Sequence, residues 1–153
     1  MTGVQTCALP ISPALGAAPV PSLIHLDTSL LVDALTGPRR SAGDLRRALG
    51  AGERLSISTL VLYEWLRGPR VESELADQEA LFPTAEAVPF GPREADLAAE
   101  LYRTVPRPRR REFDLVVAAC ALASEAELWT LNPNDFNDIP ALALFGPARS
   151  RRS

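Results

Sequence analysis

The chain has 153 residues, of which 46% are apolar and 23% are charged, and its formal net charge is −3. This length accommodates one domain with a substantial core and excludes two domains of ordinary size. No apolar run approaches the roughly 20 residues that a helix needs to cross a bilayer. The acidic balance excludes a protein that binds nucleic acid through its overall charge. Two cysteines imply no disulfide framework, so we expect a soluble protein of the reducing cytoplasm.

Residues 1–21 are expected to lie outside the folded domain. Residues 2–11, TGVQTCALPI, resemble a reading-frame translation of a short-read sequencing adapter, so we interpret residues 1–12 as a sequencing artefact. Pro10 and the lack of a basic start argue against a secretory signal. The Pro-, Ala- and Gly-rich residues that follow predict a disordered lead-in. We therefore place the domain at residues 22–146, followed by a basic tail at 147–153 that carries Arg149, Arg151 and Arg152.

From residue 23 onward, strand patterns alternate with helix patterns. The predicted strands cover residues 23–26, 54–58, 85–90, 127–131 and 142–145. The predicted helices cover residues 28–35, 60–68, 72–82, 91–105 and 113–126, and the segment 42–53 contains a short helix ended by Gly50 and Gly52. This alternation predicts an α/β fold with a mainly parallel sheet, in which ligand sites gather at the carboxyl ends of the strands.

Four acidic residues fall where that edge of the sheet would bring them together. Asp27 ends the first strand, and Glu64 lies in the helix after the second strand. Asp114 opens the most apolar helix, and Asp135 follows the strand at 127–131. Each has an ordinary alternative. Asp27 could cap a helix and Glu64 could pair with Arg67. Asp114 could interact with the helix macrodipole, and Asp135 could be a turn residue.

A cluster of these four carboxylates would need a cation. Two carboxylates about 4 Å apart repel by about 4 kcal/mol at an effective dielectric constant near 20. Oxygen ligands with no nearby His or Cys favour Mg²⁺ or Mn²⁺ over zinc. Such ions activate water and stabilise charge on a phosphate, so the cluster indicates hydrolysis of phosphodiesters.

Four motifs, in this order and spacing, resemble those of the PIN-domain ribonucleases, in particular the VapC toxins of bacterial type II toxin–antitoxin modules. They are IHLDTSLLVDAL, ISTLVLYEWLRG, REFDLVVAACALA and LWTLNPNDF, and the resemblance covers residues 23–145. By that resemblance, Asp27, Glu64 and Asp114 match the first three acids of the family. Thr28 or Ser29 matches its small hydroxyl residue beside the metal.

The fourth acidic position of the family is matched by two candidates. Many relatives carry an acid or Asn where this chain has Asn132, and another acid where it has Asp135. We assign the metal-side role to Asp135 and keep Asn132 as the alternative.

The resemblance implies a PIN-like fold and an endoribonuclease that depends on Mg²⁺ or Mn²⁺ and uses water as its nucleophile. It also implies a homodimer and a cognate antitoxin that inserts a segment into the acidic groove. A haloacid-dehalogenase-type phosphatase is a rival, but it needs a second Asp two positions after Asp27, where this chain has Ser29. A catalytically inactive PIN-like module that binds RNA or protein is the other alternative, and the presence of the first three acids argues against it.

The segment before Asp114 is basic and suits contacts with RNA phosphates or an acidic antitoxin, although a solvated loop is an equal alternative. Its arginines are Arg107, Arg109, Arg110 and Arg111. His25, the only histidine, is expected to serve packing. Trp65 and Trp129 are expected in the core.

Overall fold

The computed structural model describes residues 21–147. Within them, a three-stranded parallel sheet has the order β2-β1-β3, with β1 spanning Leu23–Leu26, β2 Arg54–Ser56 and β3 Glu127–Trp129. The helices are α1 (Thr28–Leu35), α2 (Ala42–Gly50), α3 (Thr59–Arg67), α4 (Glu72–Leu81), α5 (Pro92–Thr104) and α6 (Glu112–Ala123). The predicted α/β fold is confirmed. The expected lead-in at 1–20 and the tail arginines Arg149, Arg151 and Arg152 lie outside the described residues.

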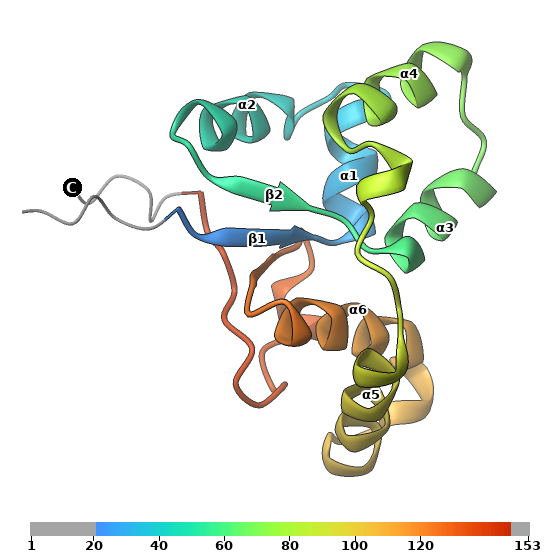
Figure 1. Ribbon diagram of the computed structural model, residues 1–153, viewed down its shortest axis with the longest axis vertical. Coiled ribbons are helices and arrows are strands. Elements are labelled where there is room, and N and C mark those ends of the chain that lie inside the picture. Colours follow the sequence, from blue (N-terminus) through green and yellow to red (C-terminus); the bar gives the residue numbers. More distant parts are fainter. Residues whose placement is uncertain (1–20, 148–153) are drawn as a thin grey trace, which may run out of the picture.

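The central strand β1 is covered on both faces. Ile24 and Leu26 are fully buried, as expected for a parallel strand that forms a continuous apolar run. Helix α6 packs on β1 and β3 and against α5, whereas α1 packs against α2, α3 and α4 on the other side (Figure 1). This arrangement places the start of α1 and of α6 near the carboxyl end of β1.

Two predicted strands are wrong. Residues 85–90 form the end of a short 3₁₀ turn, Thr84–Glu86, and a single bridge between Val88 and Ser58. Pro89 follows directly and has no amide hydrogen, so a ladder cannot continue there. Residues 142–145 likewise make one bridge, between Leu144 and Leu128.

The predicted roles of the aromatic residues and the histidine are confirmed. Trp65 and Trp129 are buried in the core. His25 is fully buried on β1, where its Nδ1 lies 3.1 Å from Oγ of Ser56. Burial lowers the pKa of His25 to about 4, so the imidazole is neutral at physiological pH. Among residues 21–147, the helices are too short or too polar to cross a membrane.

Candidate functional site

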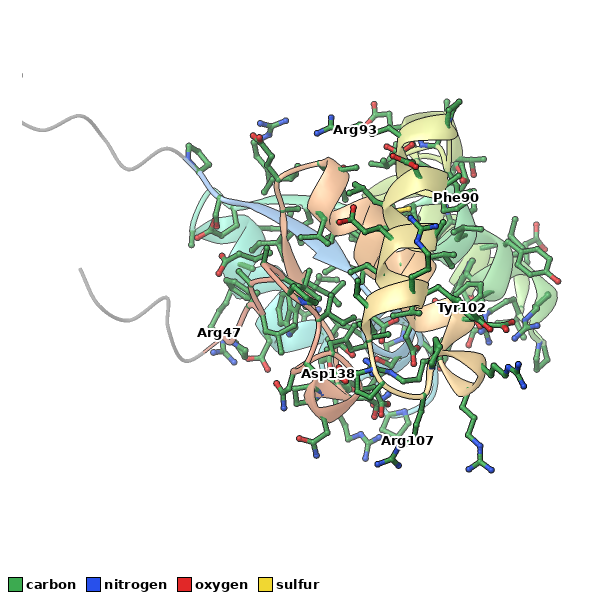
Figure 2. All side chains as sticks on the ribbon, turned by 90° about the horizontal axis from the view of Figure 1, so that it is seen from below. Arg47, Phe90, Arg93, Tyr102, Arg107 and Asp138 are labelled. Atoms are coloured by element: carbon green, nitrogen blue, oxygen red, sulfur yellow. The ribbon has the colours of Figure 1, made fainter. Side chains whose placement is uncertain are left out.

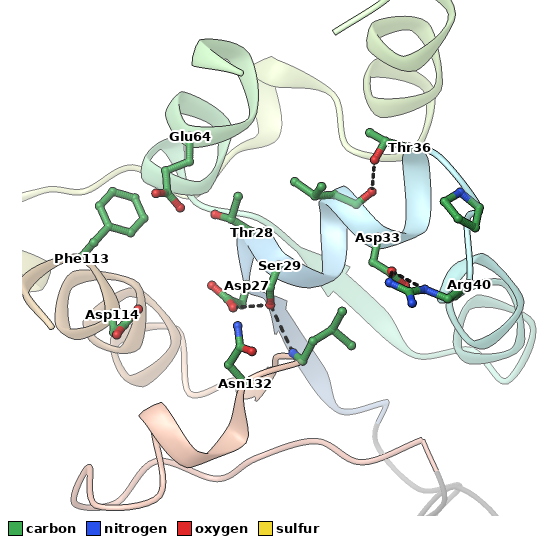
Figure 3. Close-up of a pocket in the computed structure, with 13 residues that line it drawn as sticks. Asp27, Thr28, Ser29, Asp33, Thr36, Arg40, Glu64, Phe113, Asp114 and Asn132 are labelled. Atoms are coloured by element: carbon green, nitrogen blue, oxygen red, sulfur yellow. Dashed lines mark hydrogen bonds and ion pairs between the residues drawn. The ribbon is translucent and has the colours of Figure 1, made fainter. Parts of the chain in front are cut away.

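A pocket of about 590 Å³ opens at the carboxyl end of β1 (Figure 3). Side chains from α1, α3, α6 and the segment after β3 meet there because parallel strands deliver their following loops to one edge of the sheet. The residues that line it are Asp27, Thr28, Ser29, Val32, Asp33, Thr36, Pro38, Arg40, Glu64, Phe113, Asp114, Leu131 and Asn132.

Asp27 lies at the base of this pocket and is 8% exposed. It occupies the N-cap position of α1 but makes no side-chain capping hydrogen bond, so the helix-cap alternative is wrong. Instead its Oδ2 accepts hydrogen bonds from Oγ of Ser29 at 2.6 Å and from Oγ1 of Thr130 at 2.8 Å. Both donors therefore bind the same carboxylate oxygen. The other oxygen, Oδ1, accepts no hydrogen bond from residues 21–147.

The two hydroxyl residues after Asp27 have different surroundings. Oγ of Ser29 donates to Asp27 and accepts from the amide of Leu131 at 3.2 Å, which ties α1 to the segment after β3. Oγ1 of Thr28 is buried in the pocket wall and has no hydrogen-bond partner within the described chain. Thr130 was not predicted to be a site residue, because the strand was expected to run to residue 131 and β3 ends at Trp129.

Glu64 reaches the pocket from the second turn of α3, and its side chain is 20% exposed. Its Oε1 also accepts a hydrogen bond from Nη2 of Arg67 at 3.1 Å. The pairing offered as the ordinary alternative is therefore confirmed, together with the placement at the pocket. Because the side chain of Arg67 is 60% exposed, this ion pair is of the kind that contributes little to stability and is readily exchanged.

Asp114 lies in the first turn of α6 and faces the pocket (Figure 3). Burial raises the pKa of Asp114 to about 6, and the charges of Asp27, Asp135 and Glu64 add to the rise against the opposing charge of Arg111. The other three predicted acids are therefore close enough to Asp114 for their charges to act on it. The favourable helix macrodipole does not cancel this effect.

The two candidates for the fourth position lie differently. Asn132 lines the pocket, and its backbone N–H donates to Oγ1 of Thr130 at 3.0 Å. Asp135 ends the short 3₁₀ turn Pro133–Asp135 and is exposed just outside the pocket wall, although its charge acts on Asp114.

The donor set fits a hard divalent cation. No group of three or more His, Cys, Asp or Glu side chains within residues 21–147 is arranged to hold a metal ion. In this arrangement Glu64 pairs with Arg67. The raised pKa of Asp114 and the unpartnered hydroxyl of Thr28 are the features that a bound cation would relieve.

The predicted basic segment divides into two parts. Arg111 is 16% exposed and binds both carboxylate oxygens of Asp138 at 2.7 Å, as well as the carbonyl of Asp135. The solvated-loop alternative is therefore wrong for Arg111. The other three are exposed and make no ion pair within the described chain, and Figure 2 shows Arg107 directed away from the protein body. They line a concavity of about 410 Å³, formed by Tyr102, Arg107, Pro108, Arg109 and Arg110.

Comparisons with known proteins agree with this geometry. The model of the PIN domain family matches residues 24–142. Ribonuclease VapC19 of Mycobacterium tuberculosis is 34% identical over 119 residues, which cover 76% of this chain and 94% of that protein.

The fold is also found in solved structures. The crystal structure of VapBC2 from Rickettsia felis bound to a DNA fragment from their promoter has a TM-score of 0.62 at 23% identity, and covers 80% of this chain and 97% of that one. A toxin-antitoxin complex from Klebsiella pneumoniae has a TM-score of 0.59 at 24% identity, with 82% and 97% covered. Family model, relative and fold agree, and the chain belongs to the PIN domain family.

Proposed function

We propose that this protein is a metal-dependent endoribonuclease that acts as the toxin of a cytoplasmic toxin–antitoxin pair. The observation that carries the proposal is the convergence of Asp27, Glu64 and Asp114 on one pocket, where the pKa of Asp114 rises to about 6. The similarity to a ribonuclease over 76% of the chain supports RNA as the substrate. The similar solved structure from Klebsiella pneumoniae is a toxin-antitoxin complex, which supports an antitoxin partner.

In this proposal, Asp27 and Asp114 hold Mg²⁺ or Mn²⁺ with help from Glu64 and either Asp135 or Asn132. The bound ion supplies stabilisation of the charge that develops on the phosphate and lowers the pKa of a water molecule. Ser29 and Thr130 fix the carboxylate of Asp27 by donating to its Oδ2, which leaves Oδ1 directed to the pocket.

Water is the nucleophile in this proposal because the other reactive groups are unsuited. Burial raises the pKa of the Cys120 thiol to about 11, so it is not a thiolate at neutral pH. His25 is buried and neutral below the sheet edge and does not line the pocket. A covalent intermediate is therefore not expected.

Exposed apolar side chains support the proposed homodimer. Tyr63 and Leu66 of α3 are 57% and 52% exposed, and Tyr102 of α5 is 37% exposed. Helices α3 and α5 are therefore proposed to supply the dimer surface. Arg107, Arg109 and Arg110 are proposed to contact RNA phosphates or the antitoxin, and Arg111 orients this segment through Asp138.

Cleavage with and without metal tests the proposal. Purified protein is expected to cleave RNA in Mg²⁺ or Mn²⁺, to stop in EDTA and to resume when metal is restored. Mn²⁺ at about 100 times its Kd should stabilise the fold by about 2.7 kcal/mol. Cleavage that persists in EDTA would refute the metal mechanism. A protein that neither cleaves RNA nor responds to Mn²⁺ would be an inactive binding module.

A further inference from the structure

The pocket contains one cationic side chain, Arg40, and two of its neighbours hold it in place. Nε and Nη2 of Arg40 donate to Oδ1 of Asp33 at 3.0 and 2.8 Å. The other oxygen, Oδ2 of Asp33, accepts from the amide and Oγ of Ser41 at 3.0 and 2.6 Å. The two oxygens of Asp33 thus accept four hydrogen bonds. Although Asp33 lines the pocket, it is committed to this arrangement and is not a free ligand.

The turn between α1 and α2 directs two adjacent arginines to different places. Gly37 and Arg39 adopt left-handed conformations, with φ of 53° and 51°. Such a conformation is unfavourable for Arg39 and persists only where the surroundings impose it. As a result Arg39 pairs with Asp77 of α4 at 3.0 Å, whereas Arg40 lines the acidic pocket.

The hydroxyl of Ser41 binds Asp33 and does not cap the helix that it precedes. It is buried at the N-cap position of α2, where a serine side chain ordinarily accepts a hydrogen bond from the helix amides. It makes no such bond: its backbone lies in the right-handed helical region, with φ of −82° and ψ of −6°, and its hydroxyl donates to Asp33.

We propose that Arg40 binds an RNA phosphate that flanks the cleaved one, and that Asp33 and Ser41 are positioning residues that hold its guanidinium at the pocket rim (Figure 3). This inference rests on the proposed function. A strand entering a pocket walled by carboxylates needs a cation for each flanking phosphate, and guanidinium is suited to phosphate geometry. The side chain of Arg40 is 78% exposed, and its Nη1 makes no hydrogen bond within the described chain. The guanidinium therefore keeps donors for a ligand while Asp33 fixes its orientation.

The ion pair between Arg40 and Asp33 by itself adds little to the stability of the fold. The Arg40–Asp33 pair is largely exposed on the arginine side, and such pairs contribute little to stability. The rival explanation is that Arg40 only neutralises the charge of Asp33. It predicts that replacement of Arg40 leaves RNA binding and cleavage unchanged.

Cleavage kinetics of a short single-stranded RNA in Mn²⁺, measured over a range of KCl concentrations, test the inference. We expect Arg40→Gln to raise KM severalfold with kcat nearly unchanged, because the contact is uniform between bound substrate and transition state. The slope of log(kcat/KM) against log salt should fall by about 0.7, the value for one lost phosphate contact on a single strand. Arg40→Lys should keep most of the slope.

Arg47→Gln is the matched control. Arg47 is 65% exposed, pairs with Asp44 on α2 and does not line the pocket, so KM and salt slope should stay at parental values. Equal effects of Arg40→Gln and Arg47→Gln, or no effect of Arg40→Gln, would overturn the inference while leaving RNA cleavage by the parent intact. A parent that does not cleave RNA would instead overturn the proposed function, and this inference with it.

For Asp33→Asn, the two explanations predict changes of KM in opposite directions. Removal of a negative charge from the pocket should by itself strengthen RNA binding. If Asp33 positions Arg40, the variant should instead raise KM, and Asp33→Asn combined with Arg40→Gln should be no worse than Arg40→Gln alone. A lowered KM for Asp33→Asn would refute the positioning role.

Discussion

The acidic pocket and the basic concavity formed by Tyr102 and residues 107–110 lie close together in the sequence but carry opposite charge. Arg110 is four residues before Asp114, and between them Arg111 is fixed to Asp138 and to the carbonyl of Asp135. The net charge of −3 conceals this separation, because it averages two local fields of opposite sign. The comparison teaches that a nucleic-acid surface on an acidic protein must be sought locally.

The two regions also differ in how their charges are balanced. In the pocket, burial is the largest cause of the raised pKa of Asp114, and the charges of Asp27, Asp135 and Glu64 add to the rise against the opposing charge of Arg111. In the concavity, Arg107, Arg109 and Arg110 make no ion pair within residues 21–147. One region is therefore suited to a cation and the other to an anion, which is the combination that a phosphodiester and its metal require.

The largest expected effect comes from removing one charge in the pocket. Asp114→Asn keeps the shape of the side chain but is a poor ligand for a hard cation. RNA cleavage should fall by more than about 100-fold, equivalent to about 2.7 kcal/mol of lost transition-state stabilisation. The exposed Asp96 of α5 offers a control, since Asp96→Asn makes the same chemical change away from the pocket. A fully active Asp114→Asn variant would show that the pocket is not the catalytic region.

A smaller effect is expected from the basic region. Replacement of Arg107, Arg109 and Arg110 by Ala should weaken RNA binding and reduce its salt slope by about 2, since each contact with a single strand contributes about 0.7. The control replaces Arg46, Arg47 and Arg54, which are also exposed, and changes the net charge equally. If both triple variants bind RNA alike in a titration against KCl, the concavity acts only through overall charge.

The smallest effect concerns the stability of the metal-free protein against pH. The folded pKa of Asp114 is about 6, above its unfolded value, so its contribution to stability is present below about pH 4 and is lost as pH rises through 6. Because the side chain is partly exposed, we expect Asp114→Asn to be more stable than the parent by only about 1 kcal/mol at pH 7.

Denaturant unfolding at pH 4 and pH 7 measures this difference. Burial lowers the pKa of His25, which makes both proteins less stable as pH falls from 6.5 to 4. The histidine is common to parent and variant, so the difference between their curves isolates Asp114. A variant less stable than the parent at pH 7 would support the macrodipole alternative.

The sequence was sufficient to predict those helices, strands and acidic residues whose positions depend on the local pattern of apolar residues. Asp27, Glu64 and Asp114 were predictable because the end of a parallel strand and the start of the next helix are set by apolar periodicity. The wrong strand at residues 85–90 shows the limit, since this segment has strand composition but contains Pro89.

Long-range side-chain pairs could not be predicted. Arg111 looked like its three neighbours, and only tertiary packing places it against Asp138, 27 residues later. Asp33 and Arg40 were likewise missed, because nothing in their local sequence indicates that a strained turn brings them to the same pocket.

The hydrogen bond from Thr130 to Asp27 joins residues 103 positions apart. Strand β3, which precedes Thr130, pairs with β1 only after both halves of the domain have been made. During synthesis, the ribosome must therefore release nearly the whole domain before the carboxylate of Asp27 acquires its two donors. A growing chain that has passed Asp114 still lacks this support. Because Thr130 lies near the end of the domain, the hydrogen bond that completes the orientation of Asp27 forms late in assembly of the site.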